Sequence, residues 1–129
     1  MIARLIPAAL AVALLASPIA IAQTDQQATQ RGAGWLESLT IGSVGQQADA
    51  IVALAAAGRS RDTLQRRVQA MSAAAPGYAV TAGAAGKVVL AAAATGNDPR
   101  ALGGVDYVAR IERHYRSGRY GTTAYDQAY

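Results

Sequence analysis

Two apolar segments that each end at a glycine recur along this chain, and they constrain its fold more than any other feature. Residues 46–57 are followed by Gly58, and residues 79–95 are followed by Gly96. Each segment is apolar around most of a helix circumference, which is typical of a helix sandwiched between neighbours. Glycine takes the left-handed conformation that ends helices at little cost. A period of about 40 residues with two helices per unit predicts an all-α fold of tandem helical hairpins.

An amphipathic segment follows each apolar one and supplies the second helix of each predicted hairpin. We expect Ser60 to cap the first of these helices and Pro76-Gly77 to end it. The second is predicted over residues 104–115, where valine, isoleucine and tyrosine recur at helical spacing. The sequence therefore predicts two complete hairpins between residues 46 and 115.

Shorter signals lie on either side of these hairpins. Residues 23–31 are polar and are expected to form a frayed lead-in to a first helix, which a turn over residues 40–45 follows. Thr123 with Asp126 three residues later resembles a capping box and predicts the start of a third unit. We therefore expect residues 23–129 to form a partial repeat domain that stops inside its third hairpin.

Residues 1–22 have the features of an export signal. A short basic start with Arg4 precedes an apolar run over residues 5–16, and Ala20-Ile21-Ala22 matches the small-x-small pattern of a signal peptidase site. We predict a cleaved signal peptide over residues 1–22 and a secreted or cell-envelope protein. The alternative is an uncleaved membrane anchor, because residues 5–22 are just long enough to span a bilayer.

Charge and cysteine content exclude several classes of protein. The formal net charge is +4, well below the basic density of a nucleic-acid binder, so no nucleic-acid partner is expected. The chain has no cysteine, which excludes disulfides, thiolate chemistry and cysteine-based metal sites. No membrane span is expected once the signal has been removed.

Several motifs carry a resemblance to a known superfamily. The runs ADAIVALAAAG (residues 48–58) and VLAAAATGNDPR (residues 89–100), with GWLESL (residues 34–39), resemble the helical units of α/α toroid proteins. That superfamily includes terpenoid cyclases, protein prenyltransferase β subunits and transcobalamin-like binding domains. The chain resembles, among these, secreted bacterial prenyltransferase and squalene-oxidase repeat proteins. The resemblance implies part of a ring of helical hairpins.

The chemistry that the superfamily uses is missing from this sequence. Cyclases carry an Asp-x-Asp-Asp acid and an aromatic cavity, but this chain has no such run, no Phe and one Trp. Prenyltransferases hold zinc with Asp, Cys and His, and His114 is the only histidine here. No Gly-x-Ser-x-Gly motif is present. We therefore predict no catalytic residue, metal ligand or cofactor within these residues.

Aromatic and arginine groups supply the candidate binding residues. The ligand-facing candidates are Tyr120, Tyr125, Tyr129 and Trp35, with ordinary packing inside hairpins as the alternative for each. The anion-contact candidates are Arg59, Arg61, Arg66 and Arg67, because guanidinium groups pair with phosphate and carboxylate. A second group contains Arg110, Arg113, Arg116 and Arg119, and for both groups the alternative is a solvated outer face.

Three functions remain open at this level. The first is an exported binding module for a hydrophobic or corrinoid-like ligand or for a cell-envelope protein. The second is a fragment of an isoprenoid-acting enzyme, similar to a terpene cyclase or prenyltransferase, whose catalytic residues lie beyond residue 129. The third is a structural repeat scaffold. The first rests on a resemblance of fold without catalytic groups, which is an argument by analogy.

Overall fold

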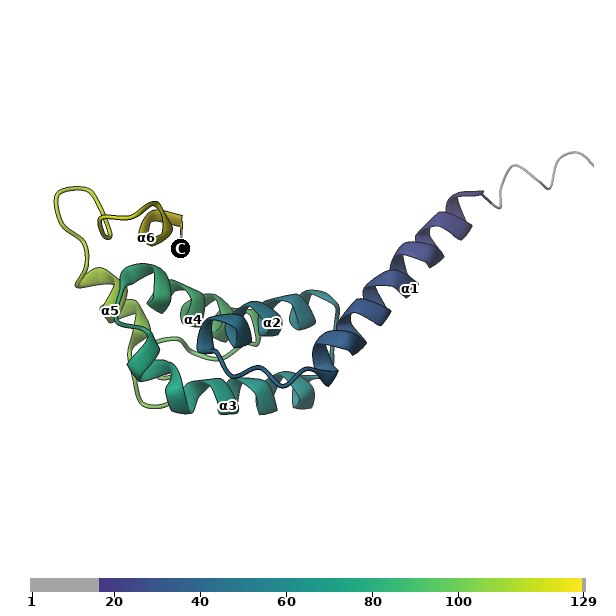
Figure 1. Ribbon diagram of the computed structural model, residues 1–129, viewed down its shortest axis with the longest axis horizontal. Helices are drawn as coiled ribbons and strands as arrows, with labels where there is room; N and C mark the ends of the chain where they lie inside the picture. Colours follow the sequence, from purple (N-terminus) through teal and green to yellow (C-terminus); the bar gives the residue numbers. More distant parts are fainter. Residues whose placement is uncertain (1–16, 129) are drawn as a thin grey trace, which may run out of the picture.

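The computed structural model describes residues 17–128, and most of these residues are helical (Figure 1). The described part contains no β-strand, only two isolated bridges within turns. The part of the chain that the structure describes is therefore all-α, as predicted. The helices are α1 (Ser17–Ser38), α2 (Val44–Ala56), α3 (Arg61–Tyr78), α4 (Ala82–Ala94), α5 (Tyr107–Glu112) and α6 (Ala124–Ala128).

The two apolar segments form α2 and α4, and glycine ends each of them. Gly58 and Gly96 take left-handed conformations, with φ of 71° and 70°, so both predicted helix ends are confirmed. The α4 helix begins three residues later than predicted, because the Thr81 hydroxyl accepts the Ala84 N–H at 3.2 Å and caps the helix there.

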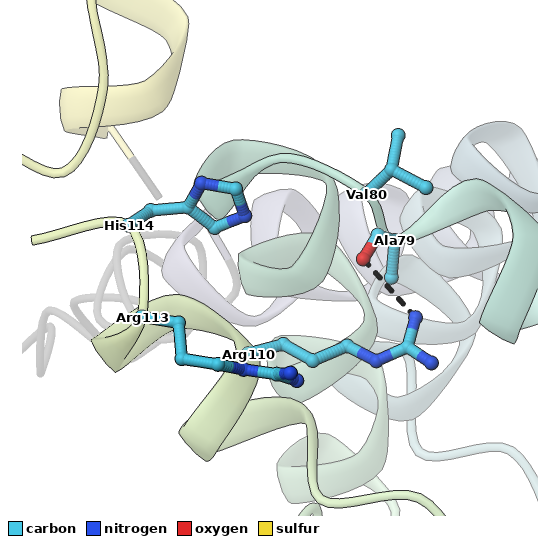
Figure 2. Close-up of a pocket in the computed structure, with 5 residues that line it drawn as sticks. All are labelled: Ala79, Val80, Arg110, Arg113 and His114. Carbon is cyan, nitrogen blue, oxygen red and sulfur yellow. Dashed lines mark hydrogen bonds between the residues drawn. The ribbon is translucent and has the colours of Figure 1, made fainter.

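The α3 helix begins as predicted and ends later than predicted. The Ser60 hydroxyl accepts the Thr63 N–H at 3.3 Å, which confirms the cap. The prediction that Pro76-Gly77 ends the helix is wrong, because α3 continues through both residues to Tyr78. The Arg110 guanidinium donates to Pro76 O (2.7 Å) and to Ala79 O (3.2 Å), the second of which Figure 2 shows, and so satisfies the carbonyls at the end of α3.

The segments at the two ends of the chain differ in opposite ways from the predictions. The predicted frayed lead-in over residues 23–31 is helical and belongs to α1. The predicted helix over residues 104–115 shortens to α5, because Gly103 and Gly104 form a left-handed turn before Asp106, whose carboxylate accepts the Ala109 N–H at 2.8 Å. The predicted capping signal at Thr123 is confirmed at the start of α6.

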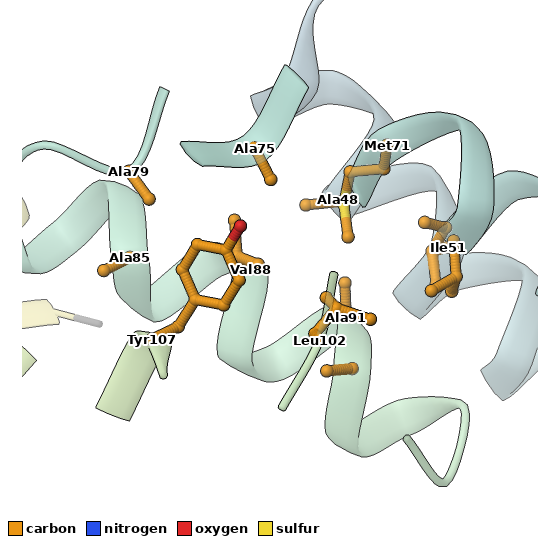
Figure 3. Close-up of a cluster of buried hydrophobic side chains, with 12 residues drawn as sticks. Ala48, Ile51, Met71, Ala75, Ala79, Ala85, Val88, Ala91, Leu102 and Tyr107 are labelled. Carbon is orange, nitrogen blue, oxygen red and sulfur yellow. The ribbon is translucent and has the colours of Figure 1, made fainter. Parts of the chain in front are cut away.

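One alanine-rich core joins helices α2, α3, α4 and α5, and several of its side chains appear in Figure 3. Ile51, Val88 and Tyr107 are among its largest fully buried side chains. Because alanine side chains are short, α2 and α4 approach closely along their length. The core consists of Ala48, Ile51, Val68, Met71, Ala75, Ala79, Ala85, Val88, Ala91, Ala92, Leu102 and Tyr107.

A smaller cluster attaches the end of α1 to the rest of the molecule. Ala33 of α1 packs with Leu54 of α2 and Leu64 of α3, and Leu36 lies against them. Only this end of α1 touches the body, since the helix runs obliquely away from the other helices in Figure 1. At the other end of the chain α6 packs on α4.

Candidate functional site

A mostly apolar hollow lies between the end of α1, the loop that follows it and one face of α2. We call it the α1–α2 groove, and it has a volume of about 500 Å³. Known ligand sites span roughly 300–1,000 Å³ and combine apolar walls with a few polar groups. The α1–α2 groove fits that description, because only Thr40, Gln46 and Asp49 bring polar side chains to it. Its lining residues are Leu36, Leu39, Thr40, Ile41, Gly42, Gln46, Asp49, Ala50 and Ala53.

Arg67 of α3 holds the wall of this groove in place. Its guanidinium donates to Leu36 O (2.8 Å) and Glu37 O (3.0 Å), and it also reaches Gln47 Oε1 at 3.1 Å. These carbonyls lie in the last turn of α1, beyond the regular bonds of the helix, and Leu36 O also accepts the Leu39 N–H at 3.4 Å. Arg67 therefore caps α1 from a different helix, and its donors are occupied by the protein rather than directed at an external anion.

The remaining predicted anion-contact residues do not gather into one site. Arg59 makes an ion pair with Glu37 at 3.1 Å and donates to Gln30 O at 3.1 Å, so it ties α1 to the end of α2. Arg61 and Arg66 are exposed at the start of α3. The structure therefore divides the group into two internal contacts and two solvated side chains.

The three predicted ligand-facing aromatic residues that the structure describes do not line the α1–α2 groove. Trp35 is 62 % exposed on α1, so the alternative that it packs inside the first hairpin is wrong. Tyr120 pairs with Tyr115, with ring centroids 5.0 Å apart. Tyr125 lies over Gly83 of α4, with its hydroxyl 3.4 Å from that of Tyr78. Tyr129 lies outside the described residues.

The groove residues themselves were not singled out from the sequence. Leu36 and Leu39 belong to the run over residues 34–39 that resembles a helical unit, and Ile41 lies in the predicted turn over residues 40–45. The available signal was an apolar residue inside that turn, since a solvated loop has little use for isoleucine. The Arg67 contact has no local signal, because its partners lie about 30 residues earlier in the chain.

Two side chains outside the groove have perturbed ionisation. The Thr123 hydroxyl, and after it the Gly83 N–H, hold the pKa of Asp126 below its usual range. Asp126 thereby links α6 to the first turn of α4, with its Oδ1 3.3 Å from the Gly83 nitrogen. Burial raises the pKa of Tyr107, and the Arg110 charge partly opposes that effect. Both shifts belong to contacts between helices and not to a reactive group in a cleft.

Residues 17–128 bring together no group of three or more His, Asp or Glu side chains that is able to hold a metal ion. Within the same residues, no helix combines the length and apolar character needed to cross a membrane. Comparisons of the chain with protein-family models, with curated proteins and with solved structures each found no match.

Proposed function

We propose that this chain is an exported helical-repeat binding module whose α1–α2 groove receives an apolar helix of a cell-envelope partner. The proposal rests on the observation that α2 and α4 correspond position by position. The correspondence appears when the two helices are aligned so that Gly58 matches Gly96. Both helices have 13 residues, and they begin after Ser43 and Thr81 and end before Gly58 and Gly96. Asp49 and Lys87 are equivalent in this alignment, and they form an ion pair at 2.7 Å between the two helices.

Two further contacts recur from one unit to the next and support a tandem arrangement of hairpins. Arg67 of α3 caps the end of α1, and Arg110 of α5 caps the end of α3. In the same way, Tyr78 covers Gly45 near the start of α2, and Tyr125 covers Gly83 near the start of α4. Repeated contacts between successive units are what a stacked array requires, and they agree with the toroid resemblance of the sequence.

The correspondence explains why the groove is a binding surface. Ala84, Val88 and Ala91 of α4 are buried, and the last two share a core with α2. Their equivalents on α2 are Gln46, Ala50 and Ala53, which line the α1–α2 groove. The groove therefore presents the face that, one unit later, is covered by a helix. A helix with small apolar side chains is the occupant that this face matches.

Export is part of the same proposal and rests on the leader over residues 1–22. Residues 1–16 lie outside the described structure, and α1 runs without a break through the predicted cleavage point after Ala22. Expression in a bacterium with the leader intact, followed by N-terminal sequencing of the extracytoplasmic protein, tests this step. A mature chain that starts at Gln23 is expected. A protein that stays in the cytoplasm with residues 1–22 still attached would contradict export.

The groove is tested with a synthetic peptide that covers residues 43–57. This peptide presents the helix face that covers α4 in the structure, so we expect it to bind the equivalent face of α2. The single tryptophan, Trp35, is adjacent to groove residue Leu36 and serves as the fluorescence reporter. Ala53→Arg places a long charged side chain in the groove and should abolish binding. Ala94→Arg adds the same side chain to an exposed site on α4 and is the matched control.

The volume of the groove favours a second candidate, a small hydrophobic molecule. Geranylgeraniol represents the isoprenoid class and cobinamide the corrinoid class. Each is titrated against the wild type, Ala53→Arg and Ala94→Arg. Binding of either probe that Ala53→Arg removes and Ala94→Arg leaves intact would identify a small molecule as the occupant. If neither the peptide nor the small molecules bind, or if Ala53→Arg binds them as well as the control, the groove is not a binding site.

A further inference from the structure

A tight turn after α5 places two arginines directly opposite each other. The Arg116 N–H donates to Arg119 O (2.7 Å) and the Arg119 N–H donates to Arg116 O (3.0 Å). Ser117 and Gly118 both have positive φ, 49° and 81°, as the two central residues of a narrow two-residue turn require. The two backbone hydrogen bonds hold Arg116 and Arg119 directly opposite each other, so their side chains leave the backbone at neighbouring positions.

The next residues on each side of the turn form an aromatic pair. The rings of Tyr115 and Tyr120 are in contact, with centroids 5.0 Å apart and planes tilted by 50°. Successive side chains of an extended pair point to opposite faces, so the tyrosines take one face and the arginines the other. The arginine face is hollowed into a pocket of about 400 Å³, which we call the basic turn pocket. It is lined by His114, Arg116, Ser117, Arg119, Gly121 and Thr122.

No carboxylate among the described residues lines the basic turn pocket. The two acidic side chains nearest in sequence have other contacts. Glu112 lies 3.7 Å from Arg100, and Asp126 accepts the Thr123 hydroxyl at 2.7 Å and the Gly83 N–H at 3.3 Å. Two like charges that face each other across a pair of strands destabilise the pairing. The two arginines of this turn repel each other in this way, and no acidic side chain among the lining residues offsets the repulsion.

A second hollow continues the positive charge on the other side of His114. It has a volume of about 340 Å³ and is lined by Ala79, Val80, Arg110, Arg113 and His114, as Figure 2 shows. Arg110 is bound to the carbonyls of α3, whereas Arg113 is exposed and bonds the carbonyl of Ala109 in its own helix. His114 therefore lines both hollows, and the arginines of the second hollow add to the positive electrostatic potential around the basic turn pocket.

We propose that the basic turn pocket binds a phosphate group. The Arg116 guanidinium donates through Nη1 to Tyr115 O at 2.7 Å, and its remaining N–H groups, together with those of Arg119, match the oxygens of a doubly charged tetrahedral anion. The hydroxyls of Ser117 and Thr122 and the imidazole of His114 add donors around the same space. A single carboxylate would neutralise only one of the two arginines. The volume also leaves room for the group that carries the phosphate.

Titration with inorganic phosphate, followed by the NMR signals of the Gly118 and Gly121 amides, tests the proposal. Arg116→Gln combined with Arg119→Gln removes both guanidinium groups. The matched control is Arg61→Gln combined with Arg66→Gln, which removes two exposed arginines of α3 and changes the net charge equally. We expect saturable shifts in the wild type and the control, and affinity at least about tenfold weaker in the turn variant.

Two further measurements separate a phosphate site from general charge attraction and from loss of the fold. Arg116→Lys combined with Arg119→Lys keeps both charges but loses the paired donors, so its affinity should fall between those of the wild type and the glutamine variant. Circular dichroism checks that each variant retains its helices. If the turn variant and the control bind inorganic phosphate equally, or if no saturable shift occurs in the wild type, the proposal is overturned.

The source of the phosphate is distinguished by vesicle binding. Vesicles of phosphatidylcholine with phosphatidylglycerol carry the group on a lipid, and vesicles of pure phosphatidylcholine are the uncharged comparison. The ligand is a lipid headgroup if the wild type binds the mixed vesicles, inorganic phosphate competes with this binding, and the turn variant does not bind them. Binding of inorganic phosphate without vesicle binding identifies a soluble phosphate compound.

Discussion

Tyr107→Phe is expected to stabilise the protein, although it removes a hydroxyl from the centre of the core. Tyr107 is 0 % exposed, and its Oη has no hydrogen-bond partner within residues 17–128. Figure 3 shows the hydroxyl directed into the alanine-rich cluster. An unpaired buried hydroxyl costs about 1–3 kcal/mol relative to its hydrated state in the unfolded chain. Phenylalanine keeps the ring and its contact with Arg110, whose guanidinium carbon lies 5.4 Å from the ring centroid.

The opposing contribution is the small cavity that the oxygen leaves. A space of about 10–15 Å³, at about 24 cal/mol per Å³, costs roughly 0.3 kcal/mol. The net gain is therefore roughly 0.7–2.7 kcal/mol, and each kcal/mol raises the melting temperature of a domain of this size by about 4–8 °C. Thermal unfolding followed by circular dichroism measures it. Tyr115→Phe, at a half-exposed tyrosine, is the control and should change little. A lower melting temperature for Tyr107→Phe would show that the hydroxyl has a partner and refute the reasoning.

Three further predictions concern contacts between helices. Gly83→Ala places a Cβ 2.5 Å from Tyr125 Cδ1, so α6 should lose its amide-exchange protection, whereas Gly77→Ala meets no neighbour within 4 Å and should not change it. The pKa of Asp126 is lower in the folded protein than in the unfolded chain, so the ionised carboxylate stabilises the fold. This stabilisation is complete above the ordinary aspartate pKa, and it is lost as the pH falls through the folded-state pKa. NMR titration of the Gly83 amide should therefore show α6 undocking only below about pH 4, and a midpoint at or above that value would contradict this. Arg67→Gln removes the guanidinium that bonds Leu36 O and Glu37 O and should lower the free energy of unfolding by about 1–2 kcal/mol in urea denaturation, with the exposed Arg66→Gln near zero.

The helix ends of this protein show which parts of the fold can be predicted from sequence. Gly58, Gly96, Ser60 and Thr123 act on backbone groups within a few residues of themselves, so their signals predicted the helix boundaries correctly. The segment over residues 104–115 was overestimated, because helical spacing of apolar residues outweighed the local signal of two adjacent glycines. For the site, the sequence analysis singled out aromatic and arginine side chains, whereas the residues that line the α1–α2 groove include neither type.

The sequence by itself determined that the chain is helical, where its two apolar helices lie and that they correspond to each other as Gly58 does to Gly96. Only the tertiary structure decided what the arginines do. Arg67 and Arg110 bond carbonyls about 30 residues earlier in the chain, whereas Arg116 and Arg119 face each other across a turn and line a pocket. The physical reason is range. Caps and periodicity depend on bonds closed within one or two helical turns, whereas a guanidinium group finds its partner only after the helices have docked.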